Sequence, residues 1–218
     1  MKNSTNDRST INLLPWGETP KEWTQNYIAA LAGGTDRPCC WVLIYPDGRT
    51  EERWAALDEA YDWIHDQNEQ EHAGVYVAIQ VTDGHGRRKD NIVSGRVVAG
   101  DADGVTIDEW HKPPTMVVQS KAGPHPYFIL DTHASVTETE AACRGLAYHY
   151  GLDPAATDPQ RVLRVPGFYH WKDLSNPFLV TLLGPEGQQG PTYATPASAG
   201  PEPGLDGKAW GTYLDWTG

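Results

Sequence analysis

The stretch RVVAGDADG, residues 96–104, combines a run of small apolar residues with two aspartates and a glycine. If the strand continues through residue 103, alternate side chains share a face, so Asp101 and Asp103 project the same way. Two neighbouring carboxylates repel each other unless a positive charge lies between them. Carboxylate oxygens suit Mg²⁺ or Mn²⁺, and Gly104 leaves the backbone open to a ligand. The stretch predicts a divalent-metal site, with an exposed Asp-Gly turn as the simpler alternative.

A second motif follows in VVQSKAGPHPYFIL, residues 117–130. Two strands joined by a Gly-Pro turn would place Ser120 and His125 near each other at the mouth of a hairpin. A hydroxyl, backbone N–H groups and an imidazole gathered there can bind a triphosphate, and Lys121 on the same turn could add charge. The alternative is a plain hairpin that carries a surface histidine.

The third motif is TDPQRVLRVPGFYHWK, residues 157–172. Asp158 is followed by Arg161, Arg164 and Lys172, and a Pro-Gly pair bends the chain between the last two. Arginines beside an acid and a rigid turn suit phosphate binding, so we expect a loop-like basic segment here. The alternative is a structural ion pair between Asp158 and Arg161.

The flanking sequence predicts both helices and strands. A helix begins at the capping residue Thr19 and ends at Gly33, and a second helix begins near Thr50, with large apolar residues on one face. A third helix spans residues 135–151, where a serine and a glutamate have capping-box spacing. Strands are predicted before the second helix and throughout the segment after Gly74.

These elements predict an α+β fold: a mixed helix–strand lobe over residues 15–72, then a lobe of antiparallel strands over residues 73–184 that carries the metal site. The active cleft is expected between the two lobes. Residues 1–14 are predicted to be a disordered lead-in. Residues 185–218 are predicted to be a linker rich in Pro and Gly and an aromatic tail.

Charge and composition narrow the function classes. The net charge of −12 argues at first against a nucleic-acid partner. However, residues 15–72 carry 12 acids and 4 bases, whereas residues 73–184 carry 12 acids and 10 bases. Several acids of the second segment are assigned to metal, so the acidity lies mostly on the first lobe and the objection to a nucleic-acid partner is weaker. The longest apolar run, residues 39–45, is too short to cross a membrane. Three cysteines without a CxxC pair and a polar N-terminus predict a reduced, cytoplasmic protein.

The three motifs, in this order, resemble the archaeo-eukaryotic primase superfamily, and most closely the RepB-type plasmid primases and the primase–polymerases of phages and mobile elements. That family carries a strand ending in DxD or DxE, a Ser…His hairpin, and a third acid before an RxLRxPG segment. The stretch DGHGRRKDNI, residues 83–92, also resembles the family, with Arg87 at its usual arginine. The resemblance covers residues 74–172, with two departures. The family often has a larger residue at the position of Ala102, and it often has Asn at the position of His170.

The resemblance implies a two-lobed fold with an α/β N-terminal lobe and an RRM-like antiparallel sheet lobe. It implies template-directed nucleotidyl transfer with two divalent ions, Mg²⁺ or Mn²⁺, on a single-stranded DNA template with NTPs or dNTPs, and a helicase or a helical accessory domain as a possible partner. The implied metal ligands and catalytic residues are Asp101, Asp103 and Asp158; the nucleotide-binding residues Ser120, His125, Arg164 and Lys172; and the template-binding residues Arg87, Arg88 and Arg161.

Four alternatives compete with this interpretation or with parts of it. Asp153 and Asp131 compete with Asp158 as the third acid. A metal-dependent nuclease uses the same carboxylates but does not need the hairpin and the RxLR segment together. An inactive primase fold that only binds nucleic acid or a partner would be expected to lose an acid. A rolling-circle nickase needs two histidines flanking one apolar residue, which HPYFILDTH, residues 125–133, does not supply.

Overall fold

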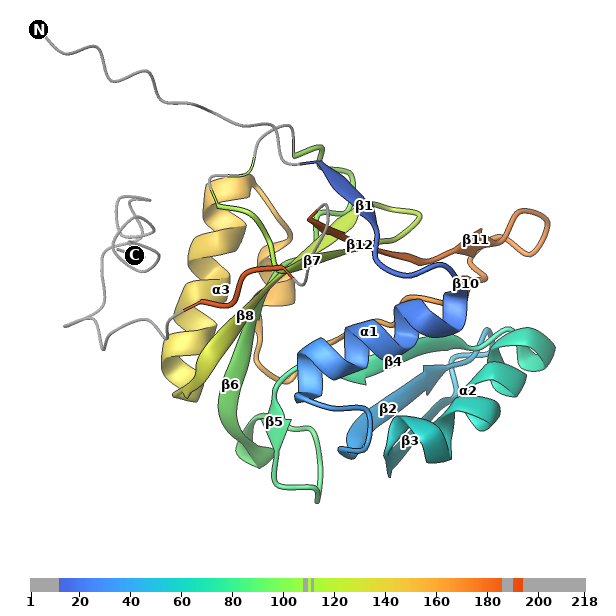
Figure 1. Cartoon of the computed structure of the whole chain (residues 1–218). Helices are drawn as coiled ribbons and strands as arrows, with labels where there is room; N and C mark the ends of the chain where they lie inside the picture. The colour runs from blue at the N-terminus through green and yellow to red at the C-terminus, as the bar shows by residue number, and fades with distance from the viewer. Residues whose placement is uncertain (1–11, 108–109, 111, 186–189, 194–218) are drawn as a thin grey trace, which may run out of the picture.

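The computed structural model describes residues 12–107, 110, 112–185 and 190–193. Within these residues the chain forms two antiparallel sheets, a short hairpin and three α-helices (Figure 1). The predicted α+β class is therefore confirmed. No helix in the described part of the chain is long and apolar enough to span a membrane.

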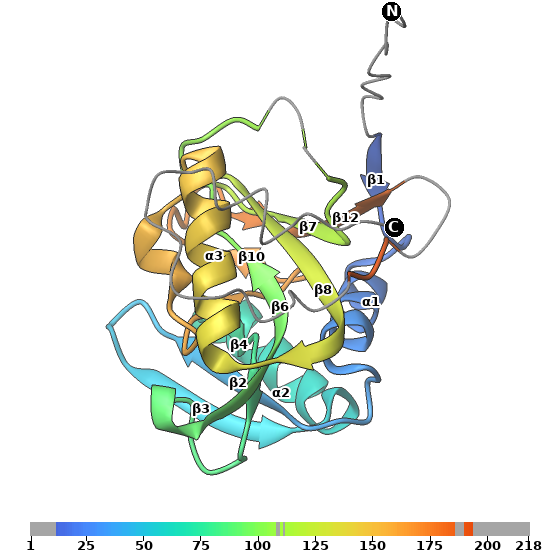
Figure 2. The ribbon, with the colours of Figure 1, turned by 90° about the vertical axis from the view of Figure 1, so that its left-hand side faces the viewer.

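The larger sheet has six strands in the order β1-β12-β7-β8-β6-β5. Its members are β1 (Leu13–Pro15), β12 (Thr181–Pro185), β7 (Met116–Gln119), β8 (Pro124–Ala134), β6 (Ile92–Ala99) and β5 (Val81–Thr82). The helix α3 (Val136–Tyr150) covers one face of this sheet, where it packs along β6 and β8 (Figure 2). The smaller cluster of buried side chains that joins them includes Val98, Phe128 and Leu146.

The second sheet has four strands in the order β3-β2-β4-β9. They are β3 (Thr50–Ala55), β2 (Cys39–Ile44), β4 (Gly74–Ala78) and β9 (Val162–Arg164). The helices α1 (Pro20–Ala32) and α2 (Leu57–Glu71) pack on one face of it. The remaining elements are the hairpin of β10 (Tyr169–His170) and β11 (Phe178–Leu179) and the 3₁₀ turns η1 (Lys89–Asn91) and η2 (Pro154–Thr157).

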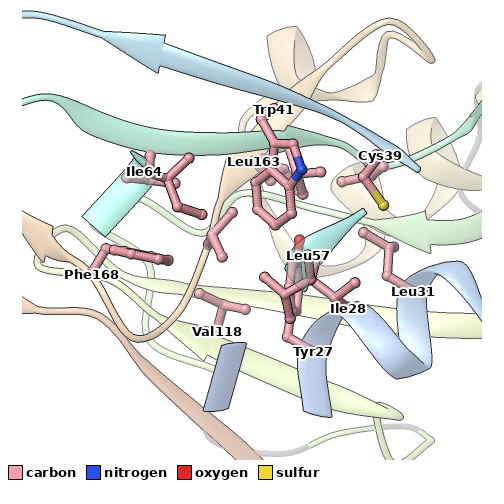
Figure 3. Close-up of a cluster of buried hydrophobic side chains, with 14 of the residues drawn as sticks. Tyr27, Ile28, Leu31, Cys39, Trp41, Leu57, Ile64, Val118, Leu163 and Phe168 are labelled. Atoms are coloured by element: carbon pink, nitrogen blue, oxygen red, sulfur yellow. The ribbon is translucent and has the colours of Figure 1, made fainter. Parts of the chain in front are cut away.

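One hydrophobic core joins the two sheets. Trp41 and Leu163 of the four-stranded sheet, Tyr27 and Ile28 of α1, and Val118 of the six-stranded sheet belong to the same buried cluster (Figure 3). At its centre the hydroxyl of Tyr27 donates a hydrogen bond of 3.1 Å to that of Tyr127 on β8. The two sheets therefore share one hydrophobic interior.

Two helix starts follow the predicted capping chemistry. The side chains of Thr19 and Ser135 each accept a hydrogen bond from a glutamate amide three residues on, and each glutamate side chain accepts from the cap's own amide. Gly33 and Gly151 end these helices in the left-handed conformation.

The structure corrects several sequence predictions about elements. Residues from Thr50 form the strand β3, and the second helix begins only at Leu57, because residues 50–55 pair with β2. The predicted loop over residues 157–172 contains β9, which pairs with β4. Both β4 and β9 belong to the four-stranded sheet together with β2 and β3, so the sheets do not follow the predicted lobe boundary between residues 72 and 73.

The predicted chain ends fall only partly within the described residues. Leu13 and Leu14, placed in the lead-in, belong to β1 and pair with β12. In the predicted linker and tail, Tyr193 is buried and forms a parallel bridge with Leu130 of β8. Residues 1–11, 186–189 and 194–218 of these segments lie outside the described residues.

The hydroxyl pair between the sheets yields a prediction about stability. Tyr27→Phe and Tyr127→Phe each leave one buried hydroxyl without its partner, so each should lower the free energy of unfolding by about 1–3 kcal/mol. The double variant removes both polar groups and should lose less than the sum of the two single losses. Urea unfolding of the four proteins measures this, and strictly additive losses would contradict it.

Candidate metal and nucleotide site

The two aspartates of the DADG motif lie on a turn beyond the strand. β6 ends at Ala99, and the prediction that Asp101 and Asp103 share a strand face is therefore wrong. Their carboxylates converge through the turn instead: the Asp103 amide donates to Oδ1 of Asp101 at 3.2 Å, and Gly104 is left-handed at φ +74°. The buried Ala102 side chain between them packs into the cluster under α3.

Backbone hydrogen bonds attach this turn to the β7–β8 hairpin. The Ala102 amide donates to the Pro124 carbonyl at 3.1 Å, and the Gly104 amide donates to the Ala122 carbonyl at 2.9 Å. Gly123 lies so close that a Cβ there would overlap the Ala102 carbonyl group. The hairpin turn and the aspartate turn thus hold each other in one arrangement, with no side chain needed at their contact.

This attachment brings His125 of β8 to the aspartates. Its Nε2 lies 3.3 Å from Oδ1 of Asp101 and 3.9 Å from Oδ1 of Asp103, and its side chain is only 5% exposed. One possible ligand atom from each of the three residues lies within 4.8 Å of the other two. Among the described residues, these three side chains form the group that could hold a metal ion. Two carboxylates and an imidazole are a donor set that fits Mn²⁺ or Mg²⁺.

The two carboxyl groups differ in their pKa values. Burial acts to raise the pKa of Asp101, but the His125 ring and the Asp103 amide outweigh it, and the pKa lies below its usual value. Burial and the charge of Asp101 raise the pKa of Asp103. A divalent cation between the carboxylates would stabilise both in the ionised form.

A cationic group lies beside the aspartates. This group is the guanidinium of Arg164 on β9. Its Nη2 is 2.9 Å from Nε2 of His170, and the guanidinium carbon lies over the ring of Tyr76, 4.6 Å from the ring centroid. The charges of Asp101 and Asp103 act on Arg164. Burial, then the charges of Arg164, Lys172 and Lys121, lower the pKa of His170 to about 4, so the ring is neutral near pH 7 and its Nε2 can accept from Arg164.

The other predicted nucleotide-binding residues differ in exposure. Ser120 is buried, and its hydroxyl accepts hydrogen bonds from the amides of Ala122 and Gly123, so it shapes the hairpin turn. Lys172 is exposed near His170. Lys121, on the turn, donates to the Asn176 carbonyl at 3.1 Å.

The structure does not place Asp158 in the metal-ligating group. Its carboxylate accepts hydrogen bonds from the amide and the side chain of Gln160, each 3.0 Å long, and so closes its own turn. Of the competing acids, Asp131 is exposed on β8, whereas the Asp153 amide donates to the Asp101 carbonyl at 2.9 Å.

The predicted template-binding arginines lie in different settings. Arg87 forms an ion pair with Glu52 on β3, with Nε 2.6 Å from Oε1. Arg88 is exposed next to it, and Arg161 donates to the Ala155 carbonyl. The sequence interpretation missed Tyr76 and treated His170 only as a departure from the family pattern. The alternation of Gly74, Tyr76 and Ala78 along β4 was the available signal for Tyr76.

Comparison with protein families identifies the chain. Residues 53–191, more than half of the sequence, match the model of the RepB DNA-primase N-terminal domain. The chain belongs to the RepB DNA-primase family. The expected membership of the archaeo-eukaryotic primase superfamily is thus confirmed. No curated protein is significantly similar to the chain.

Solved structures of primases share the fold of this RepB-family chain. The archaeo-eukaryotic primase domain of the cyanophage S-2L primase–polymerase aligns with a TM-score of 0.62 and 17% identity, over 80% of this chain and 93% of that one. The catalytic domain of primase RepB′ in complex with initiator DNA aligns with a TM-score of 0.57 and 19% identity, over 79% of this chain and 88% of that one. Another structure of primase RepB′ aligns with a TM-score of 0.57 and 20% identity, over 78% of this chain and 58% of that one.

The contact between the two turns predicts how glycine substitutions affect the site. Gly123→Ala should lower the free energy of unfolding by about 3 kcal/mol and abolish Mn²⁺ binding, because the new Cβ displaces the aspartate turn. Gly104→Ala is the control, since the space around Gly104 is open and only the left-handed backbone is strained, at about 1 kcal/mol. Urea unfolding and Mn²⁺ titration calorimetry test both; Mn²⁺ binding retained in Gly123→Ala would contradict the prediction.

The buried His170 predicts a dependence of stability on pH. Unfolding restores its ordinary pKa near 6.5, so between about pH 6.5 and pH 4 the unfolded chain binds a proton that the folded chain does not. Stability should therefore fall as the pH is lowered through this window, and His170→Asn should flatten that part of the curve. Urea unfolding of both proteins at several pH values measures the difference, and parallel curves would contradict the assignment.

Proposed function

We propose that this RepB-family chain catalyses template-directed nucleotidyl transfer, as a DNA primase, a primer-extending DNA polymerase, or both. The observation that carries the proposal is the convergence of Asp101, Asp103 and His125 beside the Arg164 guanidinium. A nucleotidyl transferase needs metal-ligating carboxylates and triphosphate-binding cations next to each other, whereas a nuclease does not need a triphosphate site.

Asp101 and Asp103 hold the divalent ions in this proposal. When bound, two such ions lower the pKa of the attacking 3′-hydroxyl and neutralise the charge that develops on the leaving pyrophosphate. The backbone attachment of the aspartate turn fixes both carboxylates before the ions arrive, which reduces the reorganisation at the reacting centre. His125 stabilises the ionised form of Asp101 from 3.3 Å away.

The nucleotide's triphosphate is proposed to contact His125, Arg164 and Lys172. Arg164 presents a planar pair of donors that suits phosphate oxygens, and its contacts with His170 and Tyr76 fix the guanidinium in orientation. Ser120 contributes indirectly, because its hydroxyl fixes the turn that precedes His125.

The template is proposed to be single-stranded DNA, since a RepB′ catalytic domain with the same fold has been solved with initiator DNA. Arg87, Arg88 and Arg161 are its proposed phosphate contacts, which would be sensitive to salt and indifferent to sequence. A helicase or a helical accessory domain remains a proposed further partner.

Two isosteric substitutions test the metal assignment. Asp101→Asn should reduce DNA or primer synthesis by at least about 10³-fold, an order expected for the loss of a major electrostatic contribution. Asp158→Asn should keep more activity than Asp101→Asn, because the Asp158 carboxylate is already hydrogen-bonded to Gln160. The assay uses a single-stranded template with Mg²⁺ or Mn²⁺ and compares NTPs with dNTPs, with and without an annealed primer.

The outcomes separate the candidate functions. Synthesis that disappears in Asp101→Asn supports the proposal, and equal losses in the two variants would return Asp158 to the metal site. Template degradation that depends on Asp101, without synthesis, would instead establish a nuclease. DNA binding without synthesis or degradation would indicate that the chain only binds nucleic acid.

A further inference from the structure

The four-stranded sheet has a second face, opposite to the helices. Side chains alternate along its strands, so the residues between Trp41, Leu43, Val75 and Val77 of the core project to the other side. The register places Cys40 opposite Trp54, Val42 opposite Tyr76, and Tyr76 opposite Arg164. We call this the outer face; α1 and α2 pack on the other side of the sheet, and α3 packs on the six-stranded sheet (Figures 1 and 2).

Two aromatic rings pack against a floor of small side chains on the outer face. Cys40, Val42 and Ala78 form the buried floor, and Trp54 and Tyr76 pack against it while remaining partly exposed. Trp54 is on β3 and Tyr76 on β4, the neighbours of β2 on either side, so their strands are about 10 Å apart. Gly74 leaves the room in which the Tyr76 ring and the Arg164 guanidinium lie.

Two guanidinium groups belong to the outer face. Arg164 lies over the Tyr76 ring, and Arg87 reaches the outer face from the loop before η1 to pair with Glu52. The charges of Glu52 and Arg87 both act on the floor residue Cys40, which places this ion pair over β2 and β3. The one acid of this face, Glu52, is therefore neutralised by a base.

The outer face continues to the candidate metal site. The charges of Asp101 and Asp103 act on both Tyr76 and Arg164, so the β9 side of the face lies beside the two carboxylates. Rings that can stack on bases, cations that can neutralise phosphates, and a route to the metal-ligating residues are the features by which proteins hold single-stranded nucleic acid. A duplex keeps its bases stacked internally and cannot use such rings.

We infer that the outer face binds the single-stranded DNA template, with a base stacked on the partly exposed Trp54 ring and the adjoining phosphates beside Arg87. The inference deepens the proposed function and rests on it for the identity of the strand as template. It adds the aromatic ring of Trp54 on β3 to the arginine contacts expected from the sequence. Trp54 is a template-positioning residue in this arrangement and takes no part in the chemistry.

The first test compares two replacements of Trp54. Trp54→Leu keeps an apolar cover over Cys40 but removes the ring, whereas Trp54→Phe keeps a ring. Fluorescence anisotropy with a labelled oligo(dT) should show roughly ten-fold weaker binding for Trp54→Leu and near-normal binding for Trp54→Phe. Tyr148→Leu, which removes a 63% exposed ring from α3, is the matched control and should bind normally. Equal binding by Trp54→Leu and the wild type would overturn the inference.

A second measurement locates the DNA directly and does not depend on the stability of a variant. Photocrosslinking of the wild-type chain to an oligonucleotide containing 5-iododeoxyuridine, followed by peptide mass spectrometry, should place adducts on Trp54. Adducts confined to other elements, such as α3, would overturn the inference.

The two readouts separate this inference from the proposed function. If the wild type synthesises DNA but Trp54→Leu binds oligo(dT) normally, the function stands and the outer-face assignment fails. If no synthesis is found but DNA binding depends on Trp54, the face is a nucleic-acid site and the catalytic proposal fails. Binding of duplex as tightly as of single strands would also contradict the stacking arrangement.

Discussion

The candidate site depends on the backbone contact between the aspartate turn and the hairpin turn. Asp101 and Asp103 carry like charges and would separate if only their side chains determined the geometry. Two amide-to-carbonyl hydrogen bonds from Ala102 and Gly104, and the close approach that Gly123 permits, hold the carboxylates together beside His125. The repulsion is thus offset by backbone contacts in the folded protein, so a divalent cation would meet ligands that are already in position.

The shared core explains how a residue of one sheet serves a site on the other. Arg164 belongs to the four-stranded sheet through β9, yet its guanidinium lies within electrostatic range of carboxylates that follow a strand of the six-stranded sheet. The turn after β9 is fixed by α1: Thr24 donates to the Pro166 carbonyl at 2.8 Å, and Gly167 lies against the Pro20 carbonyl with φ +93°. The two sheets and α1 therefore form one packed body, and Arg164 keeps its place relative to the aspartates.

The sequence predicted the parts of this arrangement that depend on local chemistry. The caps at Thr19 and Ser135 follow from hydrogen-bonding rules. The family resemblance put Asp101, Asp103 and His125 in one site but gave His125 to the nucleotide and the third metal position to Asp158, whereas the structure brings His125 to the two aspartates. The sequence did not predict β3, because Trp54 and the apolar residues of α2 lie at spacings that also fit a helix, and only pairing with β2 decides between the two.

Other features of the site also depend on tertiary placement. Whether Asp158 binds metal or closes its own turn depends on where the turn before β9 lies relative to β6, which is a tertiary question. The contact between Arg164 and His170 likewise needs β9 and the β10–β11 hairpin to be placed together. The residue types show which hydrogen bonds and metal contacts a side chain can make, and the pairing of distant strands decides which of these contacts form.

The charge distribution resolves an apparent conflict between an acidic chain and a polyanionic template. Much of the net charge of −12 comes from α2, whose acids Asp58, Glu59, Asp62, Asp66, Glu69 and Glu71 are all exposed. This helix packs on the inner face of the four-stranded sheet, so the sheet separates its acids from the guanidiniums of the outer face. At physiological ionic strength exposed charges are screened over about 8 Å, so a template strand on the outer face responds mainly to the charges beside it. Net charge therefore argues poorly against DNA binding by this chain, because a two-faced sheet can keep opposite charges on opposite sides.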